Sequence, residues 1–153
     1  MVYGGLLFGT AVTDRSIADA FEAPQWREVL TGLGQEVARV AQTEGVALEG
    51  FDGFDPNAFA PGAPPPVVAE SFARMIRHNR ASAKSHSGIW RDLAIRKRRT
   101  EVDAQLGPAI AIGARHGLAC PITAAVVRMI HEIEEGARPL ADDNLDQIAA
   151  AVA

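Results

Sequence analysis

The sequence lacks most of the features that reveal a protein's class at once. Its single cysteine, Cys120, excludes an internal disulfide and is expected to be a small buried residue. Its four histidines show no ligand spacing such as i, i+4, so we expect no metal site. A formal charge of −4 over 153 residues argues against wholesale nucleic-acid binding.

Long apolar runs are also missing. The apolar opening, residues 1–12, is far shorter than the ~20 residues that cross a bilayer, so we expect no membrane partner. It has no basic residues before it, and Asp14 and Arg15 follow it where a secretory cleavage site would lie. A cytoplasmic protein is therefore expected, with these residues forming a buried first helix.

Nucleotide-binding patterns are absent as well. A dinucleotide site needs a strand, a G-x-G-x-x-G turn and a helix, which together hold the pyrophosphate. Gly4, Gly5 and Gly9 come closest, but no strand pattern precedes them and their spacing differs. We expect these glycines to allow close helix packing, and we expect no cofactor to be bound by this chain alone.

The apolar residues that are present recur at helical spacing, and no segment alternates as a strand would. With 48% hydrophobic residues the chain can bury a core, so we predict one all-helical domain of about seven helices over residues 1–153. After the first helix, the predicted helices span residues 16–21, 25–45, 67–80, 88–95, 101–116, 121–135 and 142–152.

Between the helices, residues 49–66 are rich in proline and glycine and are predicted to form a loop. Phe51, Phe54 and Phe59 alternate with other residues inside it. They would pin the loop to the core, as in compact surface loops. The alternative is that the loop forms a lid over a pocket.

Residues 85–103 gather hydroxyls, carboxylates and a basic run between two apolar patterns. Thr100 and Asp103 have the spacing of a capping box, which would start a helix and place Glu101 at its first position. The basic run, residues 96–99, is typical of a solvated face. It could also face the nucleotide domain of a longer relative, or bind nucleic acid, which we consider the weakest alternative.

The same stretch resembles the C-terminal helical domain of ketopantoate reductase, the 2-dehydropantoate 2-reductase of pantothenate biosynthesis. The resemblance rests on Ser87, Asp92, residues 99–103, Gly107, Gly117 and Pro121. It implies a fold like the 6-phosphogluconate-dehydrogenase-like domain of that family. There an N-terminal Rossmann domain binds NADPH, and the helical domain closes over a 2-keto acid. This chain resembles only the second part, so its Rossmann domain would be absent.

The resemblance also implies site residues. In the family the glutamate of a T-E-[IV]-D motif binds the substrate's hydroxyl group, which points to Glu101. An upstream serine helps to hold the substrate's carboxylate, which points to Ser87. Ser85 is a second candidate, because the interval between serine and glutamate is longer here than in typical members. From spacing alone, Glu101 could equally be a plain helix-start carboxylate.

The sequence departs from the family in the first helix. The family's general acid is a lysine that would align just before Met1, and two asparagines after it are replaced by Gly4 and Phe8. We therefore expect no catalytic residue in this chain and no activity from it alone. The expected function is a substrate-binding and assembly domain of an NADP-dependent oxidoreductase; the alternative is a non-catalytic module that forms a homodimer through its apolar first helix.

Overall fold

The computed structural model describes residues 1–152, and the side chains of residues 1–151. These residues form helices and no β-strand, which confirms the all-helical prediction. The α-helices are α1 (Val2–Ala11), α2 (Ile17–Glu22), α3 (Arg27–Thr43), α4 (Pro65–Ala81), α5 (Gly88–Arg91), α6 (Val102–Gln105), α7 (Gly107–Arg115), α8 (Pro121–Glu134) and α9 (Asp143–Val152). Shorter turns are the 3-10 helices η1 (Pro24–Trp26) and η2 (Pro56–Phe59) and the π-helical turn η3 (Asp92–Arg96).

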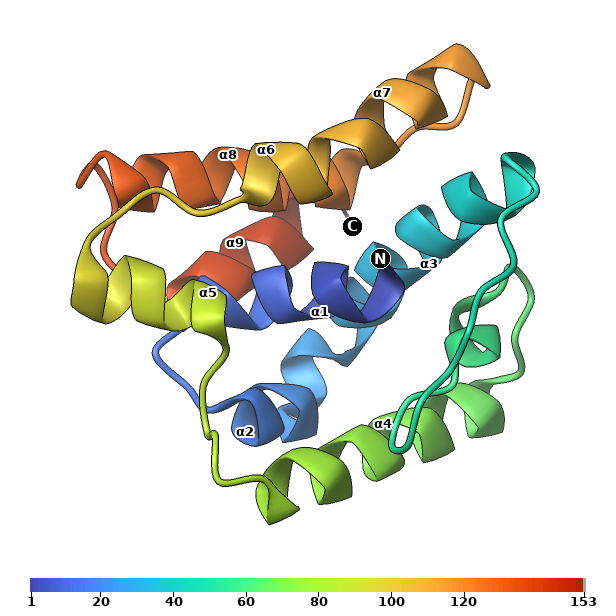
Figure 1. Ribbon diagram of the computed structural model, residues 1–153, viewed down its shortest axis with the longest axis horizontal. Helices are drawn as coiled ribbons and strands as arrows, with labels where there is room; N and C mark the ends of the chain where they lie inside the picture. The colour runs from blue at the N-terminus through green and yellow to red at the C-terminus, as the bar shows by residue number, and fades with distance from the viewer. Residues whose placement is uncertain (153) are drawn as a thin grey trace.

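Helix α1 lies at the centre of the fold (Figure 1). It has no polar face, and helices α2, α3, α5, α6 and α8 pack around it. Leu6 and Phe8 are completely buried in the core. A β-carbon on Gly9 would lie 2.8 Å from Leu33 Cδ2 of α3. The predicted role of this glycine in close helix packing is thus confirmed.

Several helix ends follow local chemistry that the sequence indicated. Ser16 caps α2 by accepting a hydrogen bond from the Asp19 amide at 3.1 Å. Gly117 adopts φ +67° after α7, a left-handed conformation that favours glycine at a helix C-terminus. Cys120, just before α8, is buried and free, as expected. Burial raises the pKa of its thiol, and the Glu36 carboxylate raises it further.

Residues 101–116 were predicted to form one helix that Pro108 would bend or deprive of one backbone hydrogen bond; the break is confirmed, but it divides the segment into two helices. The segment forms α6 and α7 with a break at Leu106, which serves as the residue before α7. Pro108, near the start of α7, has no backbone N–H to continue the hydrogen bonds of α6. The proline therefore starts a new helix.

The proline-rich loop is anchored to the core by two of its three aromatic residues. Phe54 and Phe59 are buried, which confirms the anchoring interpretation for them. Phe51 is 46% exposed and meets the Tyr3 ring edge-on, with 4.9 Å between ring centroids. The loop is less irregular than predicted, because η2 forms within it and α4 begins at Pro65.

Within residues 1–152, no helix combines the length and the apolar character needed to cross a membrane.

Candidate functional site

Ser87 is placed at the N-terminus of α5, where its side chain has a structural task. Its hydroxyl oxygen accepts a hydrogen bond from the Trp90 amide at 3.1 Å and caps the helix. The residue is 6% exposed. Because a hydroxyl can accept and donate at the same time, its proton stays available to a ligand carboxylate.

Ser85 differs from Ser87 in exposure and partners. It is exposed, and its hydroxyl lies 2.9 Å from His86 Nδ1. Its backbone carbonyl accepts a hydrogen bond from the Ile17 amide and so ties this segment to the start of α2. Of the two serines, Ser87 is held by its own helix, and Ser85 is the more accessible.

A wide turn separates the serines from Glu101. Helix α5 runs directly into the π-helical turn η3, which ends at Lys97 with φ +51°. A π turn takes one more residue per hydrogen-bonded ring than an α turn, and such turns are frequent at functional sites. It lies in the interval between Ser87 and Glu101, which we expected to be longer than in typical members of the family.

Asp92 holds the basic run in place. Its Oδ1 accepts hydrogen bonds from Arg96 at 2.6 Å and from Arg98 at 2.9 Å. The bonds from Arg98 and then Arg96 lower the pKa of the Asp92 carboxyl below its usual value. Two of the four bases are therefore engaged with this carboxylate rather than presented to an external phosphate.

Glu101 lies at the start of α6, but the capping box was wrong. Glu101 is the residue before the helix rather than its first residue, and it is exposed. Asp103 forms an ion pair with His131 at 3.0 Å instead of returning to Thr100. The Thr100 hydroxyl accepts a long bond of 3.3 Å from the Val102 amide.

The carboxylate that fixes this helix start comes from α8. Glu134 Oε1 accepts hydrogen bonds from the Thr100 amide at 2.6 Å and from the Thr100 hydroxyl at 2.8 Å. A residue 34 positions away in sequence thus orients the backbone that presents Glu101. Residue spacing within 85–103 does not indicate this contact.

Gln105 lies between Glu101 and α1. Gln105 donates a hydrogen bond to Glu101 Oε2 at 3.1 Å, and its own side-chain oxygen would lie 3.7 Å from a β-carbon on Gly4. Ser87 and Glu101 therefore sit at the starts of two short helices, α5 and α6, that both pack on α1. Phe8, which stands where the family pattern has an asparagine, is buried in the core and offers no polar contact.

Two residues beside Ser87 were missed in the sequence. The rings of His86 and Trp90 lie 3.9 Å apart between centroids. The buried ring atoms His86 Nε2 and Trp90 Nε1 have no hydrogen-bond partner among the described residues. Their i, i+4 spacing across the start of α5 was the available signal, since it brings two side chains onto one helical face.

The larger cavities of residues 1–151 lie elsewhere. One of about 480 Å³ lies beside the basic run and is lined by Leu93, Lys97 and Arg98 together with residues 133–136 and 138–140. Glu101, Ser87 and Ser85 line none of the cavities that we describe in this part of the chain. Within the same residues, no three histidine, cysteine or acidic side chains gather as metal ligands would. The described residues also form no strand–turn–helix unit of the kind that holds a dinucleotide.

Comparison with known proteins identifies the fold. The family described as "Ketopantoate reductase PanE/ApbA C terminal" matches residues 8–134, which include α5, α6 and the candidate residues Ser85, Ser87 and Glu101. No curated protein and no solved structure matches the chain. Since the match covers most of the 153 residues and the helical fold agrees with it, the chain belongs to the family of ketopantoate reductase C-terminal domains.

Proposed function

We propose that this chain is the substrate-binding and assembly domain of a ketopantoate-reductase-like, NADP-dependent oxidoreductase, completed by a cofactor domain that another polypeptide segment supplies. The observation that carries the proposal is that α5 and α6, which both lie in the matched region, pack on α1. This arrangement places a hydroxyl and a carboxylate at two helix starts.

Each candidate residue has a role suited to its chemistry. The exposed Glu101 carboxylate accepts a hydrogen bond from the hydroxyl group of a small 2-keto acid. Ser87 donates its hydroxyl proton to the substrate carboxylate, with Ser85 as the second candidate. The ring N–H of Trp90 is a further donor beside Ser87. In the complete enzyme NADPH would supply the hydride, and this chain's residues would bind and orient the acceptor.

Binding of ketopantoate to the chain, followed by amide chemical shifts, tests the site directly. Glu101→Gln and Ser87→Ala should each weaken binding about tenfold, because each removes a hydrogen bond that involves a charged group. Glu28→Gln is the matched control, since Glu28 is exposed near the start of α3 and makes none of the contacts described for Ser87 and Glu101. Equal affinities for all three variants would contradict the assignment.

A reductase assay tests the need for a second domain. With NADPH and ketopantoate, this chain alone should give no turnover above background, whereas fusion to a family Rossmann domain should restore it. Turnover by the isolated chain would refute the proposed division of labour. The DNA upstream of the Met1 codon provides an independent test, because the proposal expects a frame that encodes the cofactor domain.

A homodimer is the second candidate function. Helix α1 is largely enclosed by its own chain, so a dimer would have to use the few apolar side chains left outside, such as Met1 and Ile95, each 66% exposed. Exposed apolar side chains of this size favour a partner only when they form a contiguous patch. Sedimentation velocity at micromolar concentration decides the point, and a clean monomer would exclude the dimer.

We also propose that the protein is located in the cytoplasm.

A further inference from the structure

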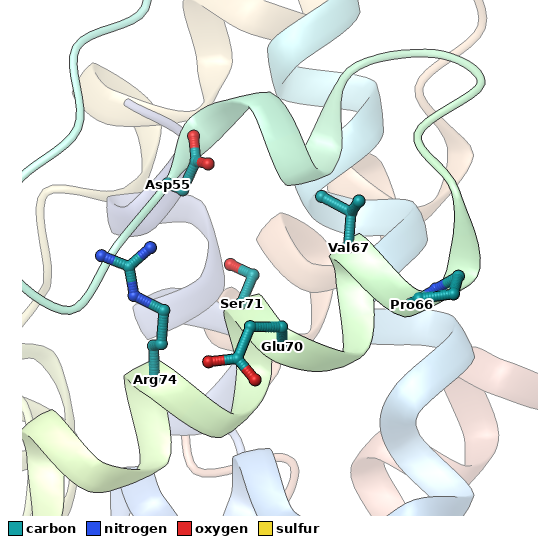
Figure 2. Close-up of a pocket in the computed structure, with 6 residues that line it drawn as sticks. All are labelled: Asp55, Pro66, Val67, Glu70, Ser71 and Arg74. Carbon is teal, nitrogen blue, oxygen red and sulfur yellow. The ribbon is translucent and has the colours of Figure 1, made fainter.

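A cavity of about 260 Å³ lies between the start of α4 and the proline-rich loop, apart from α5 and α6. Figure 2 shows the residues that line it. They are Asp55 from the loop and Pro66, Val67, Glu70, Ser71 and Arg74 from α4.

The floor of this cavity holds an unpartnered polar group. Ser71 is only 3% exposed, and its hydroxyl has no hydrogen-bond partner among the described residues. In Figure 2 the hydroxyl points toward the space between Asp55 and Arg74. A buried polar group without a partner destabilises a fold, and each such group in a native protein needs an explanation, of which a bound water, ion or ligand is one.

Opposite charges face each other across the mouth. The Arg74 guanidinium points toward the side of the cavity where the Asp55 carboxylate lies (Figure 2). Among residues 1–151 Arg74 forms no ion pair, and it does not close onto Asp55. Asp55 uses Oδ1 to accept the Asn57 amide at 2.9 Å, which leaves Oδ2 free.

The remaining walls narrow the class of ligand. Glu70 is paired with the cationic Arg77 at 3.0 Å, whereas Asp55 has no cationic partner among the described residues, so Asp55 is the better acceptor for a cationic group. Val67 is 42% exposed and, with Pro66, gives the cavity an apolar side. One free cation, one free carboxylate and one apolar wall match a molecule that carries both charges and a short aliphatic group.

We infer that this cavity binds a small aliphatic amino acid as its zwitterion. The ligand carboxylate pairs with Arg74 and accepts the Ser71 hydroxyl, and the ammonium group donates to Asp55 Oδ2. The aliphatic side chain lies on Val67 and Pro66. Because the Ser71 hydroxyl is closed to solvent in the free protein, the proposal requires a small movement of the neighbouring side chains when the ligand binds. This site is independent of the proposed function.

The test is a titration of the full chain with L-valine, followed by amide chemical shifts. We expect saturable shifts confined to residues 55–57 and 66–74, with a dissociation constant of about 1 mM. Acetate carries only the negative charge of valine, and isobutylamine carries only the positive charge. Each should bind at least about tenfold more weakly than valine, because each lacks one charge-assisted hydrogen bond. Equal binding of acetate would indicate a simple anion site and would overturn the assignment.

Variants of neighbouring residues make the test specific. Arg74→Gln and Asp55→Asn should each weaken valine binding about tenfold, and Asn can still cap η2. Arg80→Gln is the matched control, because Arg80 lies on the same helix but pairs with Asp19 and Glu22 of α2 and does not line the cavity. Ser71→Ala should weaken binding severalfold and leave the fold at least as stable, since it removes an unpartnered hydroxyl. No saturable shift with valine, or no difference between R74Q and R80Q, would refute the site.

Discussion

The buried carboxylate of Glu36 allows the sharpest prediction about stability. Glu36 lies on α3, is 7% exposed, and serves as the cap that α8 lacks in its own sequence. Its Oε1 accepts the Ile122 amide at 3.0 Å. Its Oε2 accepts the Thr123 amide at 2.8 Å and the Thr123 hydroxyl at 2.7 Å. One side chain thus joins two helices that are distant in sequence.

Glu36→Ala should lower the free energy of unfolding by about 3 kcal/mol. Two backbone amides lose their partner, each at a cost of about 1–3 kcal/mol. The helix start also loses a negative charge worth about 0.3–1 kcal/mol. Part of this loss of stability is offset, because folding of the variant no longer requires a carboxylate to be buried away from water. Since domains of this kind unfold at about 5–15 kcal/mol, the variant should still fold.

Urea unfolding followed by far-UV circular dichroism measures the effect. Glu36→Gln keeps one oxygen for Thr123 but turns an NH₂ group toward the Ile122 amide, so it should cost about 1–2 kcal/mol. Glu28→Ala, an exposed position on the same helix, should change stability by less than about 0.5 kcal/mol. If Glu36→Ala were no more destabilising than Glu28→Ala, the carboxylate would not be holding α8.

Three further predictions concern the core and the candidate site. Gly34→Ala should cost about 1–3 kcal/mol in urea unfolding, because its β-carbon would lie 2.4 Å from the buried Phe59 ring; Gly107→Ala, which meets nothing within 4 Å, is the control and should be neutral. The pKa of Asp92 is lowered in the folded state, so its contribution to stability is present above its unfolded pKa of about 4 and is lost as pH falls through the folded value. In Asp92→Asn, the free energy of unfolding measured in urea should therefore depend less on pH in that acidic range. Glu134→Gln should speed hydrogen exchange at the start of α6 without changing it in α4, and unchanged exchange at both would contradict its role.

The periodicity of apolar residues predicted most of the fold. It placed the long amphipathic helices α3, α4 and α8, because one face of each is buried and its residues recur every three or four positions. Helix α1 was predicted from the apolar content of residues 1–12 rather than from periodicity. It failed at α6 and α7, where Pro108 outweighed an otherwise continuous pattern.

The candidate site was less predictable, because its geometry depends on contacts across the fold. A capping box is a local pattern, and Thr100 and Asp103 had the right spacing for one. The Thr100 amide instead donates to Glu134, and Asp103 pairs with His131; both partners come from α8. No reading of residues 85–103 by themselves could have revealed a competitor on a distant helix.

The central position of α1 has a consequence for how this domain is made. The helix comes first in the described chain, yet several of its neighbours, α5, α6 and α8, are synthesised much later. Until α8 emerges from the ribosome, the apolar surface of α1 is only partly covered by its neighbours. A nascent chain in this state is prone to aggregation and to binding by chaperones. Nascent chains stalled before residue 121 should therefore be held by such factors, whereas the released full-length chain, which also contains the buried residues of α9, should fold without them.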